Sequence, residues 1–259
     1  MAVHIIGNNI LDTAHIQAQS GGGSPAPPDP VLLPDLFEMW EYEASPGLLV
    51  GSHAAKVLTE EGDVTSISGK VGQAASGVDD ANYLSIGEAS GVGTADSGRG
   101  SWTVLAWVRV PGLEECSENL LAKFNEAFDA TDFGTFFQID SGGNFTILAT
   151  KYGGSDSISA SASVASYAGQ WVFGMARYDA DARTISARIN NGTVQSTTAA
   201  NSWPAITDGS AFTFGAGNLG TFNVDQLMLY HRAVPDAQVL AIYNGGSGMT
   251  YAQVAAYTG

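Results

Sequence analysis

Three glutamates in one short segment are of the residue type that glycoside hydrolysis requires. Retaining glycosidases place two carboxyl groups about 5 Å apart, on either side of the sugar bond. Glu41 and Glu43 alternate in LFEMWEYEA (36–44), so they would share one face of a strand, with Glu38 behind them. No third carboxylate follows in phase. We therefore predict no catalytic residue and no enzyme, and keep a glycoside hydrolase as the third candidate function.

Other nucleophiles and metal ligands are scattered along the chain. The histidines, His4, His15, His53 and His231, show no spacing of the His-Glu-x-x-His type that binds zinc. Cys116 is the single cysteine, so no disulfide can form within the chain and no thiolate cluster can hold a metal. No Gly-x-Ser-x-Gly segment marks a serine nucleophile. These features favour binding over catalysis.

Aromatic and arginine side chains share faces of two predicted strands. Trp107 and Arg109 lie on one face of the segment 101–110, and Arg177 lies in the segment 170–179. On an open sheet face, an aromatic ring could stack on a sugar and an arginine could donate hydrogen bonds to its hydroxyls. Trp107, Arg109 and Arg177 are therefore candidate carbohydrate-binding residues. The alternative is a core tryptophan with the arginines at the rim.

The elements that would position these residues are strands. Gly is abundant, at 32 residues, and charged residues make up only 14%, which suits a β protein with many turns. Strand-type segments recur roughly every ten residues. The predicted strands are 36–44, 82–87, 101–110, 119–124, 133–140, 144–152, 157–164, 170–179, 183–190, 211–216 and 222–230. Such a series predicts an antiparallel β-sandwich.

The last of these segments joins a strand to a helix at one proline. Val224, Met228 and Tyr230 alternate on one face, and Leu227 and Leu229 on the other. A strand that is apolar on both faces is covered on both, so we expect a central strand. Pro235 suits the first turn of a short helix, and Asn244-Gly245-Gly246 ends it.

The first residues form a separate segment. SGGGSPAPPDP (20–30) is a flexible part followed by a stiffer one, so we divide the chain into residues 1–19, a linker over 20–34 and a sandwich over 35–259. Residues 1–19 are too few to form their own core. We predict that they are an N-terminal docking arm. Its partner-docking residues are Ile5, Ile6, Ile10, Leu11 and Ile16.

Charge and hydropathy exclude several partners. The formal net charge is −16, with only 10 Lys and Arg, whereas phosphate binding needs clustered basic residues. We therefore predict no nucleic-acid partner and no membrane partner. No apolar run approaches the roughly 20 residues of a membrane-spanning helix. The start of the chain lacks the features of a secretory signal, so we expect synthesis in a reducing cytoplasm.

Several of these segments together resemble a laminin-G-like domain of the concanavalin A-like lectin/glucanase superfamily. They are WEYEAS (40–45), SGKVGQAASGVDDANYLSI (68–86), SWTVLAWVRV (101–110), GQWVFGMARYDADARTISARINNG (169–192) and VDQLMLYHRAVPDAQVLAIYNGG (224–246). The resemblance implies an all-β, two-sheet antiparallel jelly-roll sandwich with one short C-terminal helix. It implies the fold more firmly than a function, since this fold hosts enzymes, lectins and adhesive modules.

The resemblance also raises the question of calcium. Many relatives bind Ca²⁺ through a loop after the first strand and an aspartate near the end, which Asp225 matches. In this chain Gly51 stands where the loop aspartate is expected, and Lys56 lies among the former ligands. An ammonium in place of a carboxylate weakens the binding of a hard dication. We expect no cofactor, and expect Asp225, the one candidate metal ligand, to accept backbone hydrogen bonds instead.

An adhesive sandwich without an export signal, and with a tethered arm, is typical of a bacteriophage structural protein. We predict a virion protein, either a capsid decoration or a tail accessory, made in the host cytoplasm. Its partners would be other virion proteins, in an oligomeric arrangement, and a surface glycan. The alternative is a bacterial extracellular carbohydrate-binding lectin.

Overall fold

The structure is a computed structural model. It describes residues 31–43, 49–78, 82–86, 101–109, 112, 118–123, 133–139, 142–151, 157–199, 212–214 and 222–258. The predicted docking arm, with Ile5, Ile6, Ile10, Leu11 and Ile16, lies outside the described residues. Within these ranges no helix is long and apolar enough to cross a membrane.

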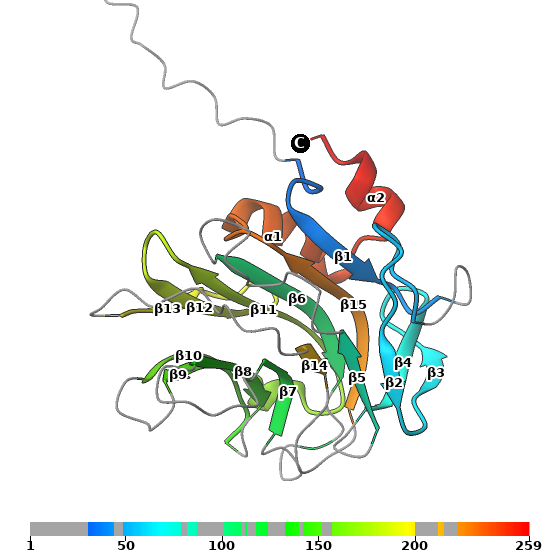
Figure 1. Cartoon of the computed structure of the whole chain (residues 1–259), viewed down its shortest axis with the longest axis horizontal. Helices are drawn as coiled ribbons and strands as arrows, with labels where there is room; N and C mark the ends of the chain where they lie inside the picture. The colour runs from blue at the N-terminus through cyan, green and yellow to red at the C-terminus, as the bar shows by residue number, and fades with distance from the viewer. Residues whose placement is uncertain are drawn as a thin grey trace, which may run out of the picture.

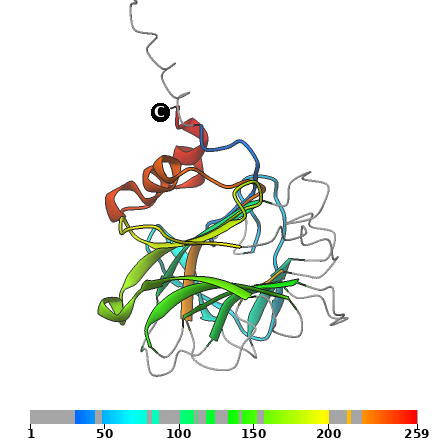
Figure 2. The same cartoon turned by 90° about the vertical axis from the view of Figure 1, so that its left-hand side faces the viewer.

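Two antiparallel sheets are stacked face to face (Figures 1 and 2). The main sheet runs in the order β13 (Gln195–Thr198), β12 (Thr184–Ile189), β11 (Trp171–Asp179), β6 (Trp102–Arg109), β15 (Phe222–Tyr230), β4 (Gln73–Val78) and β3 (Thr65–Ser68), and β1 (Leu36–Trp40) also pairs with β15. The second sheet runs in the order β10 (Ser157–Ser163), β9 (Asn144–Lys151), β8 (Phe133–Ile139), β7 (Glu118–Lys123), β14 (Phe212–Phe214), β5 (Tyr83–Ile86) and β2 (Thr59–Glu61). The predicted jelly-roll sandwich is confirmed.

Each predicted strand overlaps a strand of the structure, but four strands were not predicted. These are β2, β3, β4 and β13. The edge strands β3 and β13 consist almost entirely of polar residues, with the sequences TSIS and QSTT, and they are largely exposed. An edge strand with so little apolar surface shows no alternation of apolar and polar residues, so a search for hydrophobic pattern misses it.

The central strands of the main sheet are buried on both faces. Its inner face contributes Val104, Ala106 and Val108 to the core between the sheets. Its outer face contributes Leu105 and Trp107 to a second core, which helix α1 (Asp236–Tyr243) covers (Figure 2). The chain thus stacks three layers: the second sheet, the main sheet and a helical cover. The jelly roll supplies the first two, and the chain after Tyr230 supplies the third.

Strand β15 has the predicted central position, but a bulge changes its alternation. The pairing of β15 with β6 shifts register between Asp225 and Met228, and Gln226 has a φ of 49°. A bulge inserts one residue and reverses the faces beyond it. Val224 therefore shares the inner core with Leu227, and the prediction that it shares a face with Met228 is wrong.

The C-terminal region has one more helix than predicted. Helix α1 follows Pro235 and ends at Asn244, whose φ of 50° is left-handed, as the sequence indicated. A second helix, α2 (Tyr251–Ala256), begins with a capping box in which Thr250 and Gln253 bond to each other's backbone N–H groups. Helix α2 was not predicted, because its six residues are too few to show a helical repeat of apolar positions.

The packed domain begins earlier than the predicted boundary at residue 35. Leu32 is fully buried in the second core, and Leu33 packs against it. The Nε atom of Arg232 donates a hydrogen bond of 2.8 Å to the carbonyl of Pro34. Residues 32–34 therefore belong to the sandwich rather than to the linker.

A buried carboxylate holds the loop between β1 and β2. Oε1 of Glu38 accepts hydrogen bonds from the backbone N–H groups of Met39 (3.0 Å) and His53 (2.6 Å). Oε2 accepts from those of Ala54 and Lys56, both at 2.9 Å. A Cβ atom at Gly51 would lie 2.1 Å from Cδ of Glu38, so this position requires glycine. The loop is thus folded around the Glu38 side chain.

Replacing Glu38 by glutamine should destabilise the sandwich strongly. The amide NH₂ would take the place of one oxygen, break two accepted hydrogen bonds and point a donor at two other donors. We expect a loss of about 2–4 kcal/mol in the free energy of unfolding, measured by urea denaturation. Glu60→Gln is the matched control, because exposed Glu60 accepts one backbone N–H, that of Val64 at 2.8 Å. Equal stability of the two variants would contradict the role of Glu38.

Candidate functional site

Trp107, the predicted sugar-stacking residue, lies in the second core. It is 1% exposed. Its ring centre lies 5.2 Å from that of Phe173 and 5.7 Å from that of Tyr243 on α1, and Nζ of Lys70 lies 4.9 Å from it. A sugar has no open ring face to stack on. The open-face hypothesis for Trp107 is therefore corrected, and the alternative of a core tryptophan describes its position.

The two predicted arginines lie apart at different ends of the sheet. Arg109 is exposed at the end of β6, where its Nε atom donates to the carbonyl of Gly169 at 3.0 Å. Arg177 on β11 pairs in register with Thr103 at the other end of β6, whereas Arg109 pairs with Trp171. The structure therefore does not bring Trp107, Arg109 and Arg177 together. Of the three, Arg177 is the one that takes part in a polar cluster.

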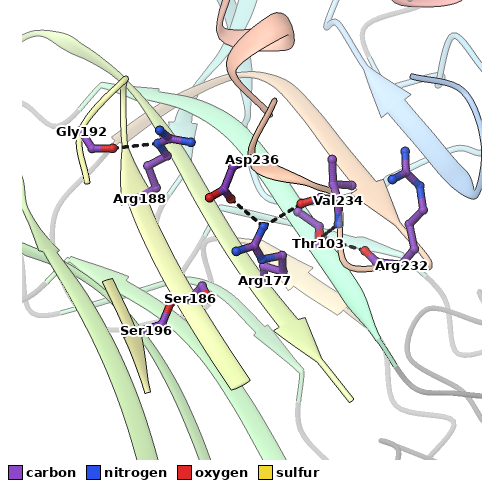
Figure 3. A network of polar contacts seen from close by, with 9 residues as sticks. All are labelled: Thr103, Arg177, Ser186, Arg188, Gly192, Ser196, Arg232, Val234 and Asp236. Atoms are coloured by element: carbon purple, nitrogen blue, oxygen red, sulfur yellow. Dashed lines mark hydrogen bonds and ion pairs between the residues drawn. The ribbon is translucent and has the colours of Figure 1, made fainter. Parts of the chain in front are cut away.

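Arg177 joins the outer face of the main sheet to the start of α1 (Figure 3). Its Nη1 atom donates to the carbonyl of Val234 at 2.8 Å and to Oδ1 of Asp236 at 2.7 Å. The side chain of Arg177 is 15% exposed and that of Asp236 is 49% exposed. Thr103 completes the attachment, since its hydroxyl donates to the carbonyl of Arg232 and accepts from the N–H of Val234. Asp236 is thus held in place with an accessible carboxylate.

Two serines extend this row to the edge of the sheet. Arg177 pairs in register with Ser186 on β12, and Ser186 pairs with Ser196 on β13. The two serine hydroxyls lie 2.8 Å apart. Ser186 is buried, whereas Ser196 is exposed, so the row runs from the solvent to the Arg177–Asp236 ion pair.

Arg188 lies on the same face as Ser186, two residues further along β12 (Figure 3). It is 7% exposed, and its Nε atom donates to the carbonyl of Gly192 at 2.9 Å. Its Nη1 atom is buried and has no hydrogen-bond partner. The sequence analysis did not identify this residue. The available signal was its position in RTISARIN, where it alternates with the apolar Ala187 and Ile189.

We name these five residues the arginine–serine surface: Arg177, Ser186, Arg188, Ser196 and Asp236. Guanidinium groups only donate hydrogen bonds, a carboxylate only accepts them, and hydroxyls do both. A sugar offers hydroxyls that both donate and accept, and some sugars add a charged group. The set therefore has the chemical complement to bind a glycan at the edge of the main sheet.

The glutamates with the spacing of a catalytic pair hold the C-terminal helix and a hairpin loop. Oε2 of Glu41 accepts from the hydroxyl of Ser52 at 2.6 Å, and Oε1 accepts from the N–H of Tyr251 at 2.7 Å. Oε1 of Glu43 accepts from the N–H of Gln73 at 3.0 Å. Strand β1 ends at Trp40, so the two residues do not continue it. The carboxylates bind different parts of the chain rather than one common ligand.

Asp225 has the predicted structural role. It is fully buried, and Oδ2 accepts from the N–H of Val71 at 2.7 Å. Burial raises the pKa of Asp225 from its ordinary value of 3.8 to about 7; its backbone hydrogen bonds oppose the rise, and the Glu43 carboxylate adds to it. The expectation that Asp225 accepts backbone hydrogen bonds is confirmed.

The residues around the expected calcium loop do not fit a calcium ion. The N–H groups of His53, Ala54 and Lys56 point at the carboxylate of Glu38, which supplies the negative charge there. Calcium needs several oxygen ligands converging on one point. In the described ranges, no three side chains of His, Cys, Asp or Glu gather so as to hold a metal.

A family model described as the concanavalin A-like lectin/glucanases superfamily matches residues 78–240. The matched segment includes β6, β11, β12 and β15, and it covers all five residues of the arginine–serine surface. Comparison with curated protein sequences gave no match.

Solved structures of binding domains have a similar fold. The binding domain of Paraclostridial Mosquitocidal Protein 1 is 16% identical with a TM-score of 0.65, and the match covers 82% of this chain and 52% of that one. The receptor-binding domain of the botulinum neurotoxin C/D mosaic serotype is 12% identical with a TM-score of 0.65, and the match covers 82% of this chain and 51% of that one. This chain thus spans about half the length of those domains.

Domain 4 of AbnA, an extracellular arabinanase from Geobacillus stearothermophilus solved with arabinotriose, is also similar. It is 16% identical with a TM-score of 0.59, and the match covers 80% of this chain and 97% of that domain. At these identities the likeness shows the fold alone. The fold is that of a lectin-like β-sandwich and resembles binding domains.

The pKa of Asp225 predicts that stability falls as pH rises. Between its ordinary value of 3.8 and about 7, the folded protein keeps a proton that the unfolded chain releases. The free energy of unfolding should therefore decrease by roughly 1 kcal/mol per pH unit over this range, and level off above it.

The comparison with Asp225→Asn isolates this effect from the general repulsion among acidic groups. Asparagine keeps an oxygen that can accept from Val71 and does not titrate. Urea unfolding at pH 4 to 8 should give a flatter stability profile for this variant than for the wild type. Parallel profiles would contradict a proton bound at Asp225.

Proposed function

This chain belongs to the concanavalin A-like lectin/glucanase superfamily, and from that premise we propose that it is a non-enzymatic glycan-binding module carried on a bacteriophage particle. The glycan-binding part rests on the arginine–serine surface, and the phage part rests on the N-terminal sequence.

One observation carries the non-enzymatic binding role. The carboxylates of Glu38, Glu41 and Glu43 each accept backbone N–H groups at 2.6–3.0 Å, so they are occupied in holding loops. The arginine–serine surface, in contrast, keeps Ser196 exposed and the Asp236 carboxylate about half exposed. Polar groups near solvent suit the recognition of a ligand, whereas the acidic pair needed for glycoside hydrolysis is engaged elsewhere.

The similarity to domain 4 of the arabinanase supports a sugar as the ligand. That domain was solved with arabinotriose, and it matches this sandwich over nearly its whole length. We extend sugar binding, but not the sugar's identity or the position of its site, to this chain. We also propose that binding needs no calcium, since backbone donors face the carboxylates that could have held the ion.

The glycan-binding role is tested on an array of neutral and acidic oligosaccharides, followed by calorimetry with the best ligand. Asp236→Asn should weaken binding about tenfold, because it removes the charge of an accessible acceptor. Asp63→Asn, an exposed aspartate near the other end of the main sheet, is the matched control and should leave binding unchanged. Binding should persist in EDTA. Absence of any binding would refute the role, and loss in EDTA would show a calcium site.

The phage part of the proposal rests on the arm. The segment 1–19 carries Val3, Ile5, Ile6, Ile10, Leu11 and Ile16, which are too few to form a core, and a Gly/Ser/Pro-rich segment follows it. If several copies dock on one capsid or tail, the tether raises the effective concentration of each arm at its docking site. Weak contacts of the single arms would then give stable attachment to the particle. The proposed localisation is therefore the virion. A bacterial extracellular lectin is the alternative.

Ile5→Asp and Leu11→Asp should abolish co-sedimentation of the protein with phage particles, because a charge cannot be buried in an apolar groove without a partner. The melting temperature of the sandwich should not change. Asn8→Asp adds the same charge at a polar position of the arm and serves as the control. Normal incorporation of both aliphatic variants would remove the docking role and favour the extracellular lectin.

A further inference from the structure

The buried guanidinium of Arg188 has an incomplete set of partners. Its Nε atom is fixed by the carbonyl of Gly192, but its Nη1 atom is buried without any hydrogen bond. No ion pair joins it to a carboxylate in the described part of the chain. A buried charge that lacks a counter-charge is costly to the folded protein. In a chain with 26 acidic residues and 10 basic ones, an arginine without an acidic partner is unexpected.

The other charges of the arginine–serine surface cancel each other. Arg177 and Asp236 form an ion pair at 2.7 Å, so together they contribute no net charge. Arg188 is the remaining cation of the surface. A ligand that binds there therefore meets one uncompensated positive charge, with the hydroxyls of Ser186 and Ser196 one row away.

The surroundings of Arg188 suit a carboxylate better than other anions. A guanidinium is a planar fork that donates two parallel hydrogen bonds to the two oxygens of a planar carboxylate. The net charge of −16 disfavours a dianionic phosphate or a polysulfate. The turn beside Arg188, at Asn191, Gly192 and Thr193, is exposed and offers an approach from solvent.

We propose that Arg188 is the anchor of a carboxylate subsite, so that this surface selects glycans that contain an acidic sugar of the uronic or sialic type. This inference rests on the proposed glycan-binding function. The ligand's carboxylate displaces the exposed turn at residues 191–193 and accepts from the unpartnered Nη1 of Arg188, and its hydroxyls bond to the exposed Ser196 and to Asp236. Binding supplies the counter-charge that the free protein lacks.

The test compares ligands that differ in one carboxylate. Calorimetry is run with an oligogalacturonate and its methyl ester, and with sialyllactose and lactose, so that the two arms distinguish a uronic from a sialic acid. The wild type should bind at least one acidic member about tenfold more tightly than its neutral partner. Arg188→Gln should abolish that preference, so that the acidic and the neutral member of each pair bind with equal affinity. Arg188→Lys, which keeps the charge but loses the fork, should retain an intermediate preference.

Two further readouts separate recognition from a structural role. Arg183→Gln removes a positive charge from the exposed turn before β12, and it should keep the preference if recognition is local to Arg188. Without ligand, the melting temperature of Arg188→Gln should equal or exceed that of the wild type, because an unpaired buried charge has been removed. The acidic oligosaccharide should then raise the melting temperature of the wild type and not that of the variant.

Equal affinity of the wild type for both members of each pair would overturn the subsite, as would a preference that survives in Arg188→Gln. In either case binding of the neutral member leaves the glycan-binding function standing. If no member binds and none of the array oligosaccharides binds, the proposed function fails, and the subsite fails with it.

Discussion

The sandwich depends on buried or half-buried carboxyl groups that accept hydrogen bonds from backbone N–H groups far away in the sequence. Glu38 holds the loop 53–56, Glu43 holds Gln73, and Asp225 holds Val71. Long loops around a jelly roll carry backbone donors that no sheet pairs, and burying them unpaired is unfavourable. A carboxylate can satisfy several donors at once, and each such bond is stronger than a neutral one. Acidic residues thus fasten loops to strands at the β1 and β4 end of the main sheet.

This use of carboxylates limits what the chain can do chemically. Gly51 stands where the resemblance leads one to expect a calcium-binding aspartate. The position has no room for a side chain, because Glu38 on the neighbouring strand fills the space. The loop therefore surrounds a built-in anion, where relatives with an aspartate in the loop would surround a cation. The acidic residues that suggested hydrolysis or calcium binding in the sequence are structural for the same physical reason.

Much of the fold could be predicted from the sequence, because it depends on local patterns. The apolar alternation of β6 and β11, the two apolar faces of β15 and the proline before α1 are all visible in a single chain. The bulge at Gln226 could not be predicted, because no residue type marks this backbone conformation. The bulge places Val224 in the core between the sheets rather than on the face of Met228. Helix α2 and the polar edge strands lacked a period to detect.

The candidate site was harder to predict, because it depends on which surfaces remain uncovered. An alternating pattern places Trp107 and Arg177 on one side of the sheet, but it does not tell that α1 lies over Trp107 and begins beside Arg177. Trp107 therefore lies in the second core, and Arg177 lies at the arginine–serine surface. Arg188 was missed because an arginine among apolar residues resembles any solvated strand position, and its burial and the missing partner of its Nη1 atom are visible in the structure alone.

The charged groups of the main sheet differ in their partners between its two edges. Near β4 and β1 the carboxyl groups accept backbone N–H groups, although Oδ1 of Asp225 has no partner, so substitutions there should change stability before they change binding. Near β12 and β13 the guanidinium of Arg188 is buried with one nitrogen bonded to Gly192 and another without a partner, and its charge has no counter-charge among the described residues, which lowers stability. Other buried polar atoms also lack a hydrogen-bond partner, among them Nε1 of Trp107 and Nη2 of Arg232, but Arg232 has Asp35 at 4.0 Å, whereas Arg188 has no ion pair among the described residues. This unpaired charge beside an exposed turn supports the proposal that the edge formed by β12 and β13 is where the sandwich binds its ligand.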